Sequence, residues 1–308
     1  MGKDNGWKTY FNDNRRYADL INGIACHGKQ LVKETDLQEE DVTARDKSRD
    51  ILRKVAFGTS FVIVGIENQE EKDYSMPLRN MFYDVSNYEK QASKIRKEVR
   101  KESKLEAGEY LYGFKKDSKL QPLATFILYA GKEPWETPNS LHDMLDFTNV
   151  PEALRDIVSD YKINVVDIRK FENTGVFQTD IKQVFDFIRC SEDMNKLLKL
   201  VENDAYYSEM EDDAFEVVTK YTNSKELVQA KDYTVKGGKN DVCKAIQDLM
   251  ADSKEKGREE GREEGRESAL QEAAKSLLDI LPDDVIVEKI GLSLEKVQEL
   301  RKDFKENN

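Results

Sequence analysis

The apolar and polar positions in the first half of the chain follow both the helical and the strand period. The spacing of Tyr17, Leu20 and Ile24 predicts an amphipathic helix, and Pro77 is suited to open a second helix that runs to about Glu106. Short apolar runs that are typical of strands occur at residues 50–57, 61–67, 110–114, 123–129 and 164–168. The mixture predicts an α/β fold for this half.

The second half has a different pattern. From Asp180 onward the apolar spacing is helical, and residues 191–222 carry nine acidic and three basic side chains, which predicts solvated, acidic helices. The repeat GREEGREEGRES at residues 257–268 predicts a charged helix that is supported by Glu–Arg pairs and weakened by three glycines. A flexible charged linker is the alternative.

Three short helices, broken at Pro282 and Gly291, are predicted after the repeat. They resemble a helix-turn-helix fragment, but a helical cap or an oligomerisation tail explains the pattern equally well. We therefore expect a core at residues 1–190, an acidic helical region at 191–252 and a charged helical tail at 253–308. The tail is the segment through which we expect the chain to form homo-oligomers.

Composition and charge exclude several classes of protein. The 308 residues include three widely spaced cysteines and two histidines, so neither a disulfide framework nor a zinc site is expected. No apolar run is long enough to span a membrane, and residues 1–20 contain no apolar signal core, which predicts a cytoplasmic protein. The net charge of −12 argues against a uniformly cationic nucleic-acid binder and leaves room for a local basic surface.

The two runs at residues 50–57 and 61–67 carry the candidate chemistry. A two-residue turn at Gly58-Thr59 would place Asp50 opposite Glu67, with Gln69 on the same face one step further along. Two opposed carboxylates destabilise a sheet unless a cation lies between them. Oxygen ligands of this kind suit Mg²⁺, which polarises a phosphoryl group and activates water. In the alternative interpretation, both acids are surface residues at strand ends.

The order of several segments resembles the Rpn family of recombination-promoting nucleases. The segments are ADLIN (18–22), RDI (49–51), GIENQ (65–69), MPLRNMFYDVSNYEKQ (76–91) and ILYAGKEPWETPNSLHDML (127–145). The resemblance extends to the GREE repeat and the short helices after it. It implies the fold of the PD-(D/E)XK superfamily, a restriction-endonuclease-like core with a central mixed sheet flanked by helices, here with a C-terminal helical extension.

The resemblance also implies roles for individual residues. Asp50 and Glu67 would hold Mg²⁺, for which Mn²⁺ could substitute, and Asp19 would help to position metal or water. Gln69 stands where the superfamily usually has lysine, so a hydrogen-bonding amide replaces a positive charge near the scissile phosphate. Without the resemblance, Asp19 is equally well explained as an exposed acid on an amphipathic helix.

Basic residues on the helix that begins near Pro77 are candidates for DNA binding. Arg79 shares a face with Tyr83 and could contact phosphate, or it could pair with a nearby acid while Tyr83 packs in the core. Five lysines recur at steps of four and three and predict one continuous basic stripe: Lys90, Lys94, Lys97, Lys101 and Lys104. A solvated helix face is the alternative.

Two functions fit these features. The first is a Mg²⁺-dependent DNA endonuclease that hydrolyses phosphodiester bonds and promotes recombination. The second is a catalytically weak or inactive protein of nuclease fold that binds DNA or assembles on it. The replacement of lysine by Gln69 favours the second, and the pair of carboxylates favours the first.

Overall fold

The computed structural model describes residues 5–39, 51–57, 60–136, 138–220, 234–235 and 239–306. The chain forms two compact units, residues 1–245 and 246–308. The first unit holds a five-stranded sheet among helices, as the α/β prediction requires. The division of the chain into parts at residues 190 and 252 stays a prediction.

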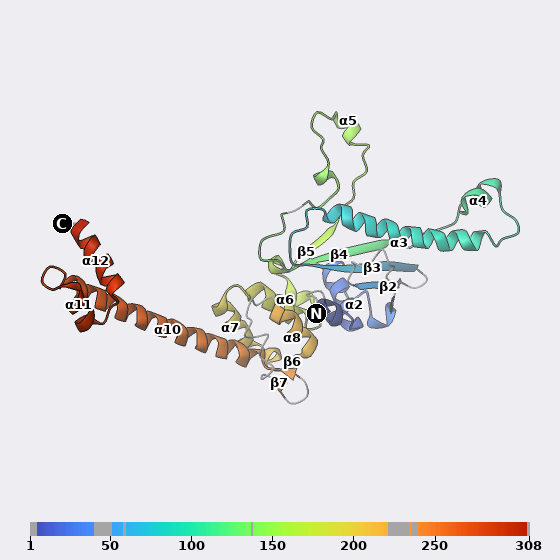
Figure 1. Cartoon of the computed structure of the whole chain (residues 1–308). Helices are drawn as coiled ribbons and strands as arrows, with labels where there is room; N and C mark the ends of the chain where they lie inside the picture. The colour runs from blue at the N-terminus through green and yellow to red at the C-terminus, as the bar shows by residue number, and fades with distance from the viewer. Residues whose placement is uncertain are drawn as a thin grey trace. The chain divides into compact units, whose positions relative to one another are not determined.

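The main sheet is mixed and its strands lie in the order β1-β2-β3-β4-β5 (Figure 1). The first three strands are antiparallel, and β3, β4 and β5 are parallel. The strands are β1 (Leu37–Glu39), β2 (Ile51–Phe57), β3 (Ser60–Gln69), β4 (Leu123–Tyr129) and β5 (Asn164–Asp167). Four of the five predicted strands are therefore confirmed.

The pairing of β2 with β3 follows the predicted register. Ile51 pairs with Ile66, Leu52 with Gly65 and Lys54 with Ile63, as expected for a two-residue turn. Asp50 and the turn residues Gly58 and Thr59 lie outside the described residues.

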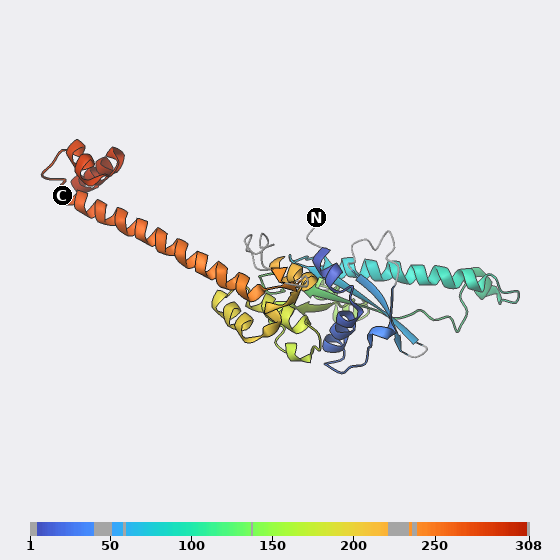
Figure 2. The same ribbon diagram turned by 90° about the horizontal axis from the view of Figure 1, so that it is seen from below.

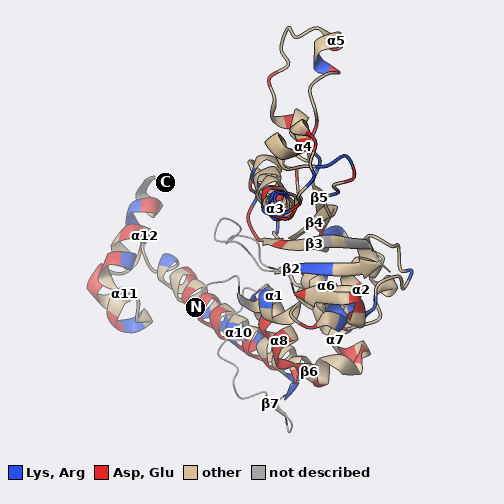
Figure 3. Ribbon diagram, turned by 90° about the vertical axis from the view of Figure 1, so that its right-hand side faces the viewer, with Lys and Arg blue, Asp and Glu red and all other residues tan. Residues whose placement is uncertain are grey.

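Helices cover both faces of the sheet (Figures 1 and 3). One face carries α3 (Met76–Val99), where Met76 packs with Ile127 of β4. The opposite face carries α1, α2 and α6, which bring large buried aromatic side chains such as Tyr17 and Phe185. These helices are α1 (Asn5–Tyr10), α2 (Asn14–Ile24) and α6 (Ile181–Cys190). The sheet therefore has two apolar faces, one facing α3 and one facing the other helices.

Asp13 caps the N-terminus of α2. Its carboxylate accepts a hydrogen bond from the backbone nitrogen of Arg15 at 2.8 Å. Replacing Asp13 with alanine should lower the free energy of unfolding by about 1 kcal/mol, because the cap is lost. Asp13→Ser keeps an acceptor and should retain most of the stability. Urea denaturation of the two variants measures the difference, and equal losses would show that the cap does not stabilise the helix.

The predictions for residues 100–114 are wrong in two respects. The helix predicted to reach Glu106 ends at Val99, where the i to i−4 hydrogen bonds give way to tighter i to i−3 bonds, from the backbone nitrogens of Lys101 to Glu98 and of Glu102 to Val99. The predicted strand at residues 110–114 is helix α4 (Ala107–Tyr112). The backbone nitrogen of Glu106 donates to the Glu109 carboxylate at 3.1 Å, and Gly113 ends α4 in the left-handed conformation at φ +66°. The lysine stripe is consequently broken after Lys97.

A buried ion-pair network joins α2 to distant parts of the first unit. The Arg16 guanidinium is 3% exposed and binds both carboxylate oxygens of Asp180, at 2.7 and 2.9 Å. It also pairs with Glu211 at 2.6 Å and with Asp213. The hydroxyl of Tyr206 donates to Asp180 at 2.5 Å. One arginine therefore ties the N-terminal helices to residues 180–213.

Short elements complete the first unit after β4. Between β4 and β5 a long excursion carries η2 (His142–Met144) and α5 (Glu152–Arg155), and it extends away from the sheet in Figure 1. After β5 follow η3 (Ile168–Lys170) and η4 (Thr174–Val176). After α6 the elements are α7 (Met194–Asn203), η5 (Ala205–Ser208), β6 (Met210–Glu211), α8 (Asp212–Lys220), β7 (Thr234–Val235) and β8 (Lys239–Asn240). Strands β6, β8 and β7 form a small antiparallel sheet in that order. Near the start of the unit, the 3-10 helix η1 (Glu34–Asp36) precedes β1.

The second unit is helical. The GREE repeat lies within α10 (Val242–Lys275), one uninterrupted helix that begins at the end of the first unit (Figure 2). A Cβ added at any of its three repeat glycines would meet nothing within 4 Å among the described residues, apart from the chain neighbours and the helix backbone. The tail then forms turns at residues 276–280, α11 (Asp283–Ile290) and α12 (Leu294–Glu306). Pro282 and Gly291 are the predicted breaks, whereas the first of the three predicted short helices is a series of turns.

A small core stabilises the end of the second unit. Ala274, Leu278, Ile286 and Val297 are buried together between the end of α10 and the two short helices. Arg301 of α12 pairs with Asp283 at 2.5 Å and donates to the backbone oxygen of Leu281 at 2.6 Å. None of the described helices in either unit is long and apolar enough to cross a membrane.

Candidate active site

Glu67 lies near the C-terminal end of β3 with its side chain on the α3 face of the sheet. Glu67 is paired in register with Ile127, whose side chain packs against Met76 of α3. The residue is only 2% exposed. Gln69 lies on the same face, and its amide donates to the Glu67 carboxylate at 3.2 Å. Two of the predicted site residues are therefore in direct contact.

Arg79 of α3 completes this cluster. Its guanidinium forms an ion pair with the Glu67 carboxylate and a second ion pair with Asp73 at 2.9 Å. Its Nε also donates to the hydroxyl of the buried Tyr83 at 2.8 Å. The shared face of Arg79 and Tyr83 thus meets Glu67, and the structure shows Arg79 as an ion-pair partner of acids.

Electrostatic effects strengthen this cluster. Burial lowers the pKa of Arg79, but the adjacent Glu67 carboxylate and the hydrogen bond to Tyr83 outweigh it, so the pKa lies above its usual value. Burial raises the pKa of Asp73. Hydrogen bonds from Ser75 and Arg79 together have the larger effect and bring this pKa below its usual value. Arg79 and Asp73 are therefore both charged at neutral pH.

Asp19 lies elsewhere, on α2 at the opposite face of the sheet (Figure 3). Its buried carboxylate accepts hydrogen bonds from the backbone nitrogens of Gln178 and Thr179 and from the Thr179 hydroxyl, at 2.7 to 3.0 Å. The structure does not bring Asp19 to Glu67. These contacts hold the segment before α6, and a role in positioning metal or water stays a prediction.

The donor atoms at the end of β3 suit a hard cation. Glu67 and Gln69 offer carboxylate and amide oxygens, and no thiol or imidazole accompanies them in this cluster. Within the described ranges, no group of three or more His, Cys, Asp or Glu side chains is placed to hold a metal ion. Asp50, the second predicted ligand, lies outside those ranges.

The predicted DNA-binding lysines divide into two groups. Lys90, Lys94 and Lys97 lie on α3, whereas Lys101 and Lys104 follow its end. Lys94 and Lys97 are exposed, and Lys101 pairs with Glu98 at 2.7 Å. Lys90, Lys94 and Lys97 lie on the half of α3 that is farther from Arg79.

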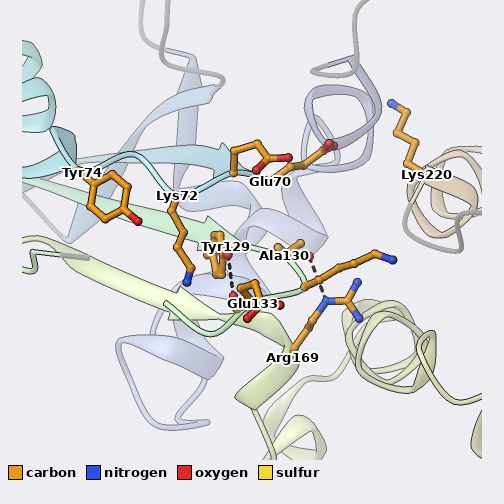
Figure 4. Close-up of a pocket in the computed structure, with 11 residues that line it drawn as sticks. Glu70, Lys72, Tyr74, Tyr129, Ala130, Glu133, Arg169 and Lys220 are labelled. Carbon is orange, nitrogen blue, oxygen red and sulfur yellow. Dashed lines mark hydrogen bonds between the residues drawn. The ribbon is translucent and has the colours of Figure 1, made fainter. Parts of the chain in front are cut away.

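A cavity of about 580 Å³ opens at the C-terminal ends of β3 and β4, directly after Gln69. The backbone oxygen of Gln69 accepts a hydrogen bond from Ala130, which lines the cavity. In Figure 4 three of its basic side chains come from separate parts of the chain: Lys72 from the loop after β3, Arg169 from η3 and Lys220 from the end of α8. Ligands of open α/β sheets bind at this edge of parallel strands.

Hydrogen bonds fix the walls of this cavity. The Tyr129 hydroxyl donates to the backbone oxygen of Glu133 at 2.7 Å (Figure 4). The Nε of Arg169 donates to the backbone oxygen of Ala130 at 3.1 Å. Burial and the nearby Asp167 raise the pKa of Tyr129, so its hydroxyl stays protonated. Gly131 is required here, since an added Cβ would overlap the Tyr129 ring and lie 2.5 Å from the Glu70 backbone oxygen. The cavity wall is therefore closely packed and well defined.

Sequence reasoning missed Asp73 and the cavity. Asp73 accepts from the backbone nitrogen of Ser75 at 2.8 Å, just ahead of Pro77, so an acid that precedes a helix start was a usable signal. The cavity residues come from four separate segments, and no local pattern in the chain connects them.

Comparison with family models identifies the class of protein to which this fold and site belong. Residues 40–216, more than half of the chain, match the model described as "Putative transposase, YhgA-like". The chain belongs to this family, which is the Rpn family that the sequence resembles. Searches of curated proteins and of solved structures gave no match.

Proposed function

We propose that the protein is a Mg²⁺-dependent endonuclease that hydrolyses DNA phosphodiester bonds, with a sheet of the PD-(D/E)XK type. The observation that carries the proposal is the buried Glu67 carboxylate at the end of β3, in contact with Gln69 and Arg79. Membership of a transposase family supports action on DNA. The register of β2 against β3 supports a second carboxylate, from Asp50, beside Glu67.

Each residue of the cluster would have a defined part in the reaction. Glu67 and Asp50 would hold the cation, which supplies electrostatic stabilisation of the charge that develops on the phosphate. The Gln69 amide would hydrogen-bond to the attacking water or to a phosphate oxygen, since it can donate and accept without carrying charge. Arg79 would move from Glu67 toward the phosphate, for which its planar guanidinium is suited.

Nicking of supercoiled plasmid by the full chain tests the proposal. We expect conversion to the open circle with Mg²⁺ or Mn²⁺ and none with a chelator. A preparation that binds DNA but never nicks it, over a range of plasmids and both metals, would contradict the proposal.

A protein of nuclease fold that binds DNA without cleaving it is the second candidate. It is favoured by the ion pair of Arg79 with Glu67, which neutralises the carboxylate from within the chain, and by Gln69 at the position of the usual lysine. Metal binding separates the two candidates, because only the endonuclease needs a cation at Glu67.

Replacing Arg79 with glutamine should tighten Mn²⁺ binding on the order of fivefold. In this variant the cation would no longer compete with the ion pair between Arg79 and Glu67. Such an ion pair contributes about 1 kcal/mol, which corresponds to the expected change in affinity. Plasmid nicking by the same variant should fall, because the phosphate loses a partner. Titration calorimetry measures the affinity, with Arg155→Gln as the control variant. An unchanged Mn²⁺ affinity would show that Arg79 and the metal do not share Glu67.

A further inference from the structure

The far half of α3 and the segment that follows it form a distinct projection, which we call the arm (residues 90–119). In Figures 1 and 2 α3 runs beyond the edge of the sheet and carries α4 at its far end. Gly113 packs against the side chain of Arg96, and Lys115 pairs with Glu102 at 2.9 Å. Arg96 also lies over the Phe114 ring at 5.5 Å. These contacts fold α4 and its returning loop against α3.

The arm is basic although the chain is acidic. It holds ten basic and five acidic side chains, an excess of five, against a net charge of −12 for the whole protein. Figure 3 shows basic residues around this end of α3. Six of the basic residues are exposed and have no carboxylate partner among the described residues: Lys94, Lys97, Arg100, Lys104, Lys116 and Lys119. Cations in this state are available to phosphate groups.

Two aromatic rings project from the same arm. Tyr110 is 74% exposed and Tyr112 is 70% exposed, while Leu111 between them is 66% exposed. The sequence pattern predicted a strand here, in which such side chains would be half-buried, but α4 presents all three to solvent. Exposed rings beside unpaired cations are the combination that binds unstacked bases and their phosphates.

We propose that the arm binds single-stranded nucleic acid, with Tyr110 and Tyr112 stacking on bases and the lysines contacting the backbone. A duplex hides its base faces within the stack, so the rings would have no such partner there. This inference rests on the proposed action on DNA, and it names unpaired DNA as the form that the arm holds.

Fluorescence anisotropy with labelled oligothymidylate, on the full chain and without divalent metal, tests the inference. The wild type should bind the oligothymidylate more tightly than a duplex of the same length. Tyr110→Ala and Tyr112→Ala should each weaken binding to the single strand about tenfold, whereas Tyr110→Phe should retain it. Ile157→Ala, an equally exposed apolar residue on another projection, is the control and should change nothing.

Lys94→Gln and Lys97→Gln should weaken binding to the single strand and lower its salt dependence by about 0.7 for each phosphate that is no longer neutralised. Wild-type affinity in both tyrosine-to-alanine variants would overturn the proposal. A change of oligomeric state in those variants with unchanged oligonucleotide binding would overturn it in favour of self-association. Oligonucleotide binding is measured without divalent metal and plasmid nicking with it, so failure of the arm and failure of the nuclease site are separate results.

Discussion

Replacing Glu67 with glutamine should reduce metal-stimulated nicking of plasmid on the order of 10³-fold. The substitution keeps the size of the side chain and its capacity to hydrogen-bond with Gln69 and Arg79, but removes the charge that would hold a cation. A loss of about 4 kcal/mol of transition-state stabilisation corresponds to this factor. Asp50→Asn should give a loss of similar size if both carboxylates hold the same ion.

Glu70→Gln is the matched control for this experiment. Glu70 lies three residues further along, lines the cavity and is partly exposed, so its charge is close to the site without being buried in it. Nicking by the control should stay within a few-fold of the wild type. Thermal unfolding of both variants verifies that they are folded. Equal nicking by wild type and Glu67→Gln would remove Glu67 from the catalytic site.

Replacing Arg16 with leucine should lower the free energy of unfolding by about 3–5 kcal/mol. The arginine is buried and pairs with Asp180, Glu211 and Asp213. Its removal leaves these acids without their shared cation, and Asp180, with a side chain only 10% exposed, has little access to water. Such a loss is a large part of the stability of a typical domain, so we expect a lower yield of folded protein as well.

The adjacent Arg15 provides the control, because its side chain is 63% exposed and pairs only with Asp13 among the described residues. Arg15→Leu should cost at most about 1 kcal/mol, as expected for a surface ion pair. Guanidinium denaturation followed by circular dichroism measures both variants. Similar losses for the two would show that burial does not make the Arg16 network more stabilising than a surface pair.

Much of the sheet could be predicted because its strands are short apolar runs with clear ends. Strand β4 has the predicted bounds, and the register of β2 against β3 follows from the two-residue turn alone. The contact between Glu67 and Gln69 follows from the alternation of side chains along one strand. These features are determined by residues that are close together in the chain, so a local sequence pattern is enough to predict them.

The failures lie where distant residues decide the structure. The aromatic and apolar residues at 110–112 are typical of a strand, but they lie in a short helix that Glu106 caps at its start and Gly113 at its end. The approach of Arg79 to Glu67 depends on how α3 lies across the sheet. The position of Asp19 depends on the loop at residues 178–179, about 160 residues away in the chain.

The hydrogen bonds of α2 have a practical consequence for anyone who trims this protein. The match to the family begins at residue 40, yet α2 precedes it and supplies Arg16 to Asp180, Tyr17 to the backbone oxygen of Val64 and Asp19 to Thr179. A fragment cut at the family boundary would leave Asp180 without its cation, deprive Thr179 of its acceptor and expose apolar residues of the sheet and α6 to water. Expression limits for this chain should therefore be drawn upstream of the matched segment, at the first helix.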